Sequence, residues 1–218
     1  MFSTIEQLQA AMRAILPGAR LAPQSLPDAP EIKLLLLAQD YPQRDLSQQE
    51  MVQVMDNPLY WIFCWASGQV LARYLLDQPE LVRGRRVLDF GCGSGVAGIA
   101  AALAGARDVV ACDIDPLALA ATRVNAAGNN VNVDLCGSYF EVAGDIDLVI
   151  VADVLYDRGN FDWLQRFLER ANEVLIADSR VKDFDVPPYR QVARMDGCTI
   201  PDLDESAEFR DVRIYCAP

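Results

Sequence analysis

A glycine-rich turn near the middle of the chain is the feature most able to support chemistry. The segment VLDFGCGSG joins a predicted strand, Arg86–Phe90, to a predicted helix, Val96–Leu103. Glycines let the backbone turn tightly and approach a ligand closely, and a helix N-terminus directs free N–H groups at it. The turn therefore predicts a cofactor site. Its predicted contacts are Asp89, Gly91, Cys92 and Gly93.

Two kinds of cofactor compete for this turn. Residues 93–98 also spell G-x-G-x-x-G, the dinucleotide fingerprint. In that fingerprint the first glycine closes the strand directly, whereas here Gly91 does so and Asp89 stands two residues before it. A carboxylate suits a cofactor with a cationic amino-acid tail, such as S-adenosylmethionine, and repels a pyrophosphate. We therefore favour the methyl donor over a dinucleotide.

Asp113 follows the next predicted strand, Asp108–Cys112. In this class of fold a carboxylate at that place accepts hydrogen bonds from the ribose hydroxyls. The alternative for Asp113 and Asp115 is to cap the following helix. Asp115 fits that alternative better because it directly precedes Pro116. Asp113 is therefore the candidate for ribose binding.

A third acidic position, Asp153, follows the predicted strand 147–152, and Tyr156 lies three residues further on. Ligands of open parallel sheets bind outside the carboxyl ends of the strands. We therefore predict that Asp153 and Tyr156, with Asp157 as a further candidate, face the methyl group as catalytic residues. They would orient an amine and pass its proton towards water. The alternative is that Asp153 caps a turn and Tyr156 packs on the sheet.

Composition excludes several other chemistries. The chain has no histidine, which removes serine–histidine and cysteine–histidine catalysis, and its six cysteines form no C-x-x-C pair. We predict no metal site. The net charge of −12 and the lack of a basic cluster argue against nucleic acid and favour a basic or small neutral substrate. No apolar run approaches the ~20 residues of a membrane span. We expect a cytoplasmic monomer.

The elements that position these residues alternate between strand and helix after residue 85. Such alternation predicts an α/β, Rossmann-like, seven-stranded sheet that is mostly parallel, with the last strand antiparallel and helices on both faces. Before it we expect a helix at 4–16, a proline-marked loop, a strand at 31–38, a mobile connection at 42–58 and a helix at 69–76. The other predicted strands are 131–135, 173–177, 190–195 and 211–216, and the other helices end near 127 and 171. We divide the chain into an N-terminal helix and extension, 1–56, packed on a methyltransferase domain, 57–218.

Together these motifs carry a resemblance. VLDFGCGSG, ACDIDP and DLVIVADVLYD look like the class I S-adenosylmethionine-dependent methyltransferases. The upstream segment NPLYWIFCWASGQ is similar to the methyltransferase-like family 16 group. Within it, the chain resembles the branch of electron-transfer-flavoprotein β-subunit lysine methyltransferases and predicted nicotinamide N-methylases. The resemblance covers roughly residues 31–180.

The resemblance implies further site residues. Trp65 matches a tryptophan near the cofactor, for which core packing is the equal alternative, and Ala152 matches a backbone contact. Ile114, beside the ribose acid, is carried over with it. For adenine, Ser138 or Tyr139 is implied. One departure concerns substrate choice: relatives often have D-P-G-R after the fifth strand, and this chain has Asp178-Ser179-Arg180.

Three functions remain open from the sequence. The first is N-methylation of lysine side chains in a protein. The second is N-methylation of a small amine, nicotinamide-like or other. The third is a cofactor-binding protein without catalysis, against which the intact acids and glycines argue.

Overall fold

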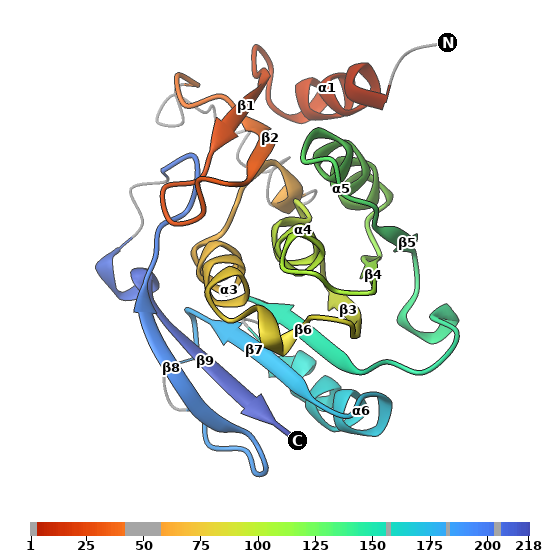
Figure 1. Ribbon diagram of the computed structural model, residues 1–218. Helices are drawn as coiled ribbons and strands as arrows, with labels where there is room; N and C mark the ends of the chain where they lie inside the picture. The colour runs from red at the N-terminus through yellow and green to blue at the C-terminus, as the bar shows by residue number, and fades with distance from the viewer. Residues whose placement is uncertain (1–3, 42–57, 156–157, 182–183, 203–205) are drawn as a thin grey trace.

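A seven-stranded sheet forms the centre of the molecule, in the strand order β5-β4-β3-β6-β7-β9-β8 (Figure 1). The computed structural model describes residues 4–41, 58–155, 158–181, 184–202 and 206–218. Strands β5 to β7 pair in parallel, while β9 pairs antiparallel with both β7 and β8. The predicted fold class, with its antiparallel last strand, is confirmed.

The strands of this sheet are β3 (Arg86–Phe90), β4 (Asp108–Cys112), β5 (Asp134–Cys136), β6 (Leu148–Ala152), β7 (Val174–Asp178), β8 (Arg190–Asp196) and β9 (Asp211–Ala217). The helices are α1 (Thr4–Ile15), α3 (Ala66–Asp77), α4 (Val96–Leu103), α5 (Pro116–Gly128) and α6 (Asp162–Arg170). A separate hairpin consists of β1 (Leu21–Ser25) and β2 (Lys33–Leu37), and short 3-10 helices include η2 (Tyr60–Ile62), η4 (Tyr139–Glu141), η5 (Arg158–Phe161) and η6 (Ala207–Arg210).

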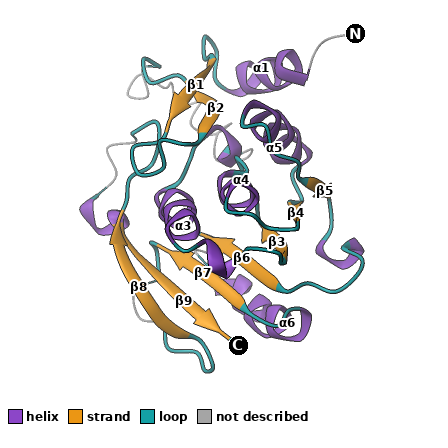
Figure 2. Ribbon diagram, viewed as in Figure 1, coloured by secondary structure: helices purple, strands orange, loops and turns teal. Residues whose placement is uncertain are grey.

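Helices cover both faces of the sheet, as Figure 2 shows. On one face α3 and α4 contribute to a core in which Val70, Leu71 and Ile99 are fully buried against strand residues such as Val87 and Ile150. On the other face α6 buries its apolar side, through Leu164 and Phe167, against a second core. The apolar faces of α3, α4 and α6 thus shield both faces of the sheet from water.

The N-terminal elements pack on α5. Leu8 and Met12 of α1 form a third buried cluster with Ala118 and Ala121 of α5. The β1–β2 hairpin joins the main core instead, through Leu34 and Leu36, which are fully buried. The described part of residues 1–56 therefore belongs to the packed body, while the predicted connection 42–58 lies, except for Pro58, outside the described residues.

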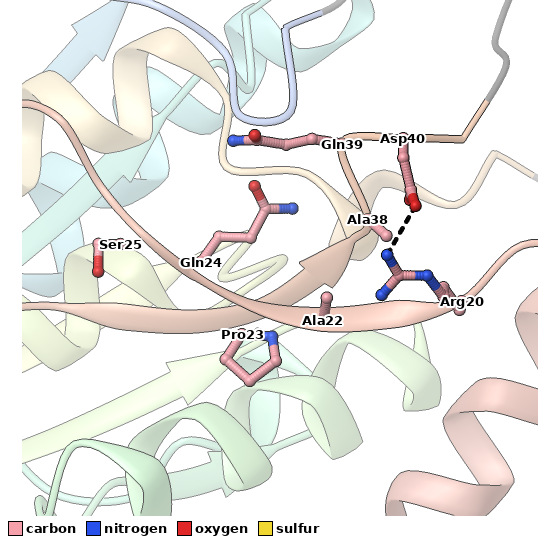
Figure 3. A pocket seen from close by; sticks show the side chains of 8 residues that line it. All are labelled: Arg20, Ala22, Pro23, Gln24, Ser25, Ala38, Gln39 and Asp40. Atoms are coloured by element: carbon pink, nitrogen blue, oxygen red, sulfur yellow. Dashed lines mark hydrogen bonds and ion pairs between the residues drawn. The ribbon is translucent and has the colours of Figure 1, made fainter.

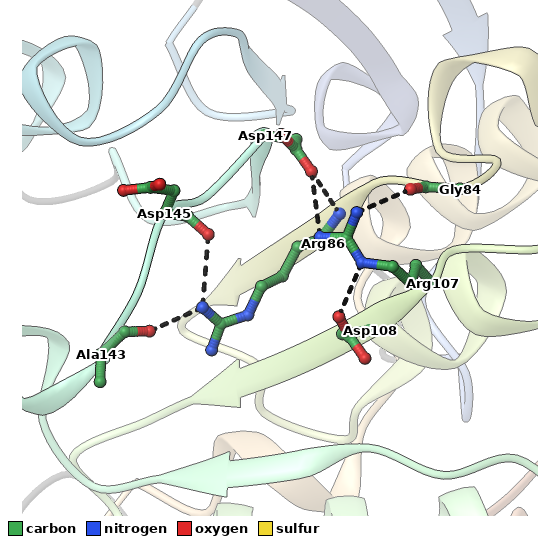
Figure 4. A network of polar contacts seen from close by, with 7 residues as sticks. All are labelled: Gly84, Arg86, Arg107, Asp108, Ala143, Asp145 and Asp147. Atoms are coloured by element: carbon green, nitrogen blue, oxygen red, sulfur yellow. Dashed lines mark hydrogen bonds and ion pairs between the residues drawn. The ribbon is translucent and has the colours of Figure 1, made fainter.

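Polar contacts fix where the parallel strands begin (Figure 4). The backbone N–H of Arg86 donates to the Asp147 carboxylate at 2.7 Å, and its guanidinium donates to the Ala143 and Asp145 carbonyls. Arg107 donates to Asp108 at 3.0 Å and lies 3.5 Å from Asp147. These contacts lie at the amino ends of β3, β4 and β6. They leave the carboxyl ends of these strands available for a site.

Two predicted elements differ from those observed. The proline-marked segment after α1 contains β1, because Pro23 sits in a two-stranded sheet where the missing N–H is tolerated at an edge. The strand expected at 131–135 is β5, shorter and shifted to Asp134–Cys136. Asn130 has φ 57° and Val131 donates to the Ala126 carbonyl, so the helix end extends into the expected strand.

At the other end of the sheet, β8 is an edge strand, and its residues are mostly exposed. Its pairing with β9 contains a register shift between Gln191 and Ala193. Arg194 of β8 pairs with Asp211 of β9, with nitrogen–oxygen distances of 2.5 and 3.1 Å. Among the described residues, none of the helices has the length and apolar character needed to cross a bilayer.

Candidate cofactor and substrate site

The strand order reverses between β3 and β6, and the predicted site residues gather at the carboxyl ends of these strands. Phe90, the last residue of β3, aligns with Cys112 of β4 on one side and Val151 of β6 on the other. From β3 the chain crosses to β4 and β5 in one direction, while β6 and β7 lie in the other. Such a switch point is where open α/β sheets bind ligands.

The glycine turn after β3 adopts backbone conformations that only glycine takes easily. Gly91, Gly93 and Gly95 have φ of 70°, 52° and 85°. A Cβ atom on Gly93 would have only the Gly91 carbonyl oxygen nearby, at 4.0 Å, so the space beside Gly93 is open. Gly95 differs, because a Cβ there would lie 2.8 Å from Thr122 Cγ2. The turn thus packs tightly on α5 and leaves room for a ligand at Gly93.

Three backbone N–H groups of the turn donate within the protein and are therefore not available to a ligand. Gly91 and Cys92 both donate to the Cys112 carbonyl, at 2.8 and 3.1 Å. Gly93 donates to Asp113 at 3.0 Å. No hydrogen bond among the described residues uses the Gly91 carbonyl oxygen. The Gly91 carbonyl is therefore left as an acceptor, which suits a cationic ligand better than a pyrophosphate.

Asp89 is buried, with 2% exposure, and its Oδ2 accepts the Gly98 N–H at 2.9 Å. Burial raises the pKa of Asp89 to about 7, against the opposing effect of the Gly98 hydrogen bond. The carboxylate thereby anchors the first turns of α4 to β3. Its predicted direct contact with the cofactor stays a prediction, because the observed partner is the protein backbone.

Cys92 is likewise buried, and its Sγ lies 3.3 Å from Thr122 Oγ1. Desolvation raises the pKa of this thiol, with neighbouring Asp89 and Asp113 adding to the shift. The side chain is therefore an uncharged packing group. Any contact of Cys92 with a cofactor would come from its backbone.

Asp113 is partly exposed and connects the glycine turn with α5. Its Oδ2 accepts from Gly93 N–H at 3.0 Å and its Oδ1 from Asp115 N–H at 3.0 Å. Burial raises its pKa, and these backbone donors act in the opposite direction. Each oxygen keeps a lone pair for a ribose hydroxyl. Asp115 is the helix cap, accepting from Leu117 N–H at 2.8 Å, as the sequence predicted.

Beside Asp113 the surface is apolar. Ile114 is 91% exposed, which is unusual for a large aliphatic side chain with no partner on its face. Ser138 caps η4 without a side-chain hydrogen bond to it, whereas Tyr139 donates its hydroxyl to the Arg166 carbonyl at 2.9 Å. Tyr139 also packs edge-on against Phe90, with ring centroids 5.8 Å apart. Of the two adenine candidates, Ser138 is the one with an uncommitted side chain.

Asp153 follows Ala152 at the end of β6 and takes a left-handed conformation, φ 50°. Its Oδ1 accepts from the Ser67 hydroxyl at 2.7 Å and from the Ser179 hydroxyl and N–H at 2.8 and 3.1 Å. Its Oδ2 is buried with no hydrogen-bond partner among the described residues. A buried oxygen without a partner costs about 1–3 kcal/mol, so this atom is placed to receive a donor. Tyr156 and Asp157 lie outside the described residues.

A second carboxylate, Asp178 at the end of β7, lies near Asp153. It is 1% exposed, and its Oδ1 accepts the N–H groups of Arg180 and Val181 at 2.8 and 2.6 Å. Burial and, to a lesser extent, the charge of Asp153 raise its pKa to about 6. Its Oδ2 also lacks a partner among the described residues. We noted Asp178 in the sequence only as part of a departure from relatives.

Trp65 caps the start of α3 with its ring partly exposed. Its indole N–H donates to the Tyr60 carbonyl at 3.1 Å, and its ring centroid lies 5.4 Å from that of Phe63. The Arg180 guanidinium lies 5.9 Å from the ring centroid of Trp65 and 3.8 Å from that of Phe209. Trp65 is thus held at the start of α3 by a hydrogen bond, by aromatic packing and by the Arg180 guanidinium.

Comparison with known proteins agrees with this geometry. The family model of the ribosomal protein L11 methyltransferase (PrmA) matches residues 70–180. The electron transfer flavoprotein beta subunit lysine methyltransferase of Xenopus laevis is 39% identical over 173 residues, covering 74% of this chain and 68% of that protein. The protein of the same name from Danio rerio is 40% identical over 152 residues, covering 66% and 59%. The human relative is covered over 48% of its length, so the chain spans only part of these relatives.

Solved structures show the same fold. A putative RNA methyltransferase from Pyrococcus horikoshii superposes with a TM-score of 0.52 at 18% identity, over 69% of this chain and 81% of that one. Magnesium protoporphyrin IX methyltransferase from Synechocystis, solved with bound S-adenosylmethionine, gives 0.51 at 16% identity, over 77% and 81%.

The sheet order and the glycine turn are those of a Rossmann-like fold, and the family model and the relatives show that the chain is an S-adenosylmethionine-dependent methyltransferase. Within that class, the chain belongs to the family of the electron transfer flavoprotein beta subunit lysine methyltransferases.

Proposed function

We propose that this protein transfers a methyl group from S-adenosylmethionine to lysine side chains of a protein substrate. The observation that carries the proposal is the polarity of the site at the sheet's switch point. Three backbone donors of the glycine turn, those of Gly91, Cys92 and Gly93, bond to the protein itself. The site leaves three acceptors for a ligand: the Gly91 carbonyl, the Asp113 carboxylate and Asp153 Oδ2. A site of acceptors selects a cationic nucleoside and a cationic acceptor amine over phosphates.

The residues present fit S-adenosylmethionine. The open side of Gly93 leaves room for the cofactor, Asp113 offers lone pairs to the ribose, and exposed Ile114 offers an apolar surface to adenine. The groups we propose to hold the cofactor are Trp65, Asp89, Gly91, Cys92, Gly93, Asp113, Ile114, Ser138 and Ala152. Asp89 and Cys92 would act through the turn that they hold in place.

Bound here, the cofactor would supply a sulfonium methyl group for in-line displacement by a nitrogen lone pair. The protein must align the amine, exclude water and remove a proton, because a lysine has a reference pKa of about 10.4. Asp153 is suited to align the amine, since its Oδ1 is fixed by Ser67 and Ser179 while its Oδ2 is available to an N–H donor. We propose Tyr156 as the second group on the amine, on the sequence pattern alone.

The electrostatic balance supports a basic protein substrate. The net charge of −12 produces a field that attracts a lysine-bearing surface and repels nucleic acid. The relatives' names specify the beta subunit of electron transfer flavoprotein, which makes that protein the first to test. We further propose that the chain works as a monomer in a reducing compartment such as the cytoplasm; all six of its cysteines are free.

Binding and transfer can be tested in sequence. Isothermal titration should show binding of S-adenosylmethionine and its demethylated product, and none of NADH. Incubation with radiolabelled donor and the purified flavoprotein beta subunit, then with host extract, should label a protein band. Label confined to small molecules would support the small-amine alternative instead. Donor binding without any transfer would leave a non-catalytic cofactor-binding protein.

A further inference from the structure

We propose that Asn125 of α5 is a positioning residue for the glycine turn and that it ties the β1–β2 hairpin to the methyl-donor site. The inference rests on the proposed function, because it assigns that turn to the cofactor. It makes an N-terminal element, which the sequence placed outside the methyltransferase domain, a part of the cofactor site's support.

One face of α5 holds the carbonyl groups of the turn. The Asn125 amide donates to the Ser94 carbonyl at 2.8 Å, and the Thr122 hydroxyl donates to the Gly93 carbonyl at 3.3 Å. Asn125 is 2% exposed and Thr122 is fully buried. The two residues are three positions apart on one helix, so they project from the same side. Together they fix two consecutive peptide planes, Gly93 and Ser94, next to the space that the cofactor would fill.

The same amide holds the hairpin from the other side. Asn125 Oδ1 accepts the N–H of Leu35 in β2 at 2.7 Å. One turn later, Asn129 accepts from the Lys33 N–H at 3.0 Å and donates to the Lys33 carbonyl at 2.7 Å. Figure 1 shows β2 beside α5. The two asparagine side chains bond to backbone groups on the edge of β2 that β1 does not cover.

The Asn125 amide therefore links two segments: its nitrogen donates to the Ser94 carbonyl and its oxygen accepts from the Leu35 N–H. A buried amide with both ends engaged has one orientation, and releasing one end lets it rotate and lose the other. If the Leu35 N–H left, the Ser94 carbonyl would lose a fixed donor. By reciprocity, a cofactor that stabilises the turn must stabilise the contact with Leu35 as well.

The hollow on the hairpin is a different feature. It is lined by Arg20, Ala22, Pro23, Gln24, Ser25, Ala38, Gln39 and Asp40, and an ion pair between Arg20 and Asp40 closes one end (Figure 3). None of these residues belongs to the glycine turn or to α5. The tie through Asn125 is thus the direct polar link from the hairpin to the turn among the described residues.

The test uses three variants of the full chain. Asn125→Asp keeps an acceptor for Leu35, and in its ionised form it replaces the donor to Ser94 with an acceptor. It is measured at several pH values from 7 to 9, because burial raises the pKa of a carboxyl and only the ionised form lacks a donor. Asn125→Ala removes both contacts. Asn129→Ala is the control, because it loosens the hairpin at Lys33 without touching the turn.

We expect both Asn125 variants to bind S-adenosylmethionine about tenfold more weakly by isothermal titration, with Asn129→Ala within twofold of wild type. Hydrogen exchange supplies a readout that lost stability alone would not move. Cofactor should slow exchange of the Leu35 amide in wild type and in Asn129→Ala, but not in Asn125→Ala. Equal affinity of wild type and Asn125→Asp, or equal weakening in all three variants, would overturn the inference. If wild type itself binds no donor, the proposed function falls and the inference with it.

Discussion

Replacing Asp89 by asparagine should make the protein's stability less sensitive to pH. The carboxyl is 2% exposed, and its observed hydrogen bond comes from the Gly98 N–H at 2.9 Å. Asparagine has the same shape, and its carbonyl oxygen can accept that hydrogen bond. It carries no charge, so the variant removes the desolvation of a carboxylate and little else.

The direction in which stability changes with pH follows from proton linkage. Burial raises the pKa of Asp89 from 3.8 to about 7, so between these values the folded protein binds more protons than the unfolded chain. Stability is therefore lost as pH rises through this window. The full shift corresponds to about 4 kcal/mol, of which about 2–3 kcal/mol falls between pH 5 and 8.

The measurement is urea unfolding of wild type and Asp89→Asn, without cofactor, at several pH values from 5 to 8. Other titrating groups are common to both proteins and cancel in the difference. We expect the unfolding free energy of the variant to gain on that of wild type by about 2–3 kcal/mol across this range. A difference that stays constant within about 0.5 kcal/mol would refute the assignment of a buried, easily protonated carboxyl.

Three further substitutions test the site. Asp113→Ala should weaken S-adenosylmethionine binding by about 5- to 150-fold in isothermal titration, the effect of losing about 1–3 kcal/mol from charged hydrogen bonds; unchanged affinity would remove Asp113 from the ribose site. Gly93→Val should abolish donor binding by filling the open space beside the turn, whereas Gly84→Val, with a similar φ of 73° and equally open surroundings, should bind normally. If both variants bind alike, steric exclusion at Gly93 is wrong. Asp153→Asn should lower kcat in the radiolabel assay while donor affinity stays within twofold; an unaltered kcat would exclude a catalytic role.

Local patterns in the sequence were enough to predict the strands of the sheet and the residues at their carboxyl ends. Strands such as Arg86–Phe90 and Asp108–Cys112 are short apolar runs between helical periods, and the structure has them at those bounds. The helix cap at Asp115 was also predictable, because the cap, Pro116 and the helix are adjacent in sequence. Prediction succeeded for elements whose determining residues are adjacent in the sequence.

Contacts between distant segments were not predictable. Asp153 binds Ser67 across 86 residues, and Asn125 binds Leu35 across 90. No spacing rule links such pairs, so the sequence indicated Asp153 as a site residue but not Ser67 and Ser179, which donate to its Oδ1. The partners of the Gly91, Cys92 and Gly93 amides were not predictable for a related reason, since Cys112 ends the next strand and Asp113 follows it.

The position of β8 at the edge of the sheet bears on whether two molecules can associate through their strands at high concentration. An outermost strand with a regular ladder of free amides can recruit the same strand of another molecule, and the product grows into insoluble ribbons. Here the pairing of β8 with β9 shifts register between Gln191 and Ala193, and β8 has the exposed charged residues Arg190 and Asp196. Both features oppose pairing between the β8 strands of two molecules.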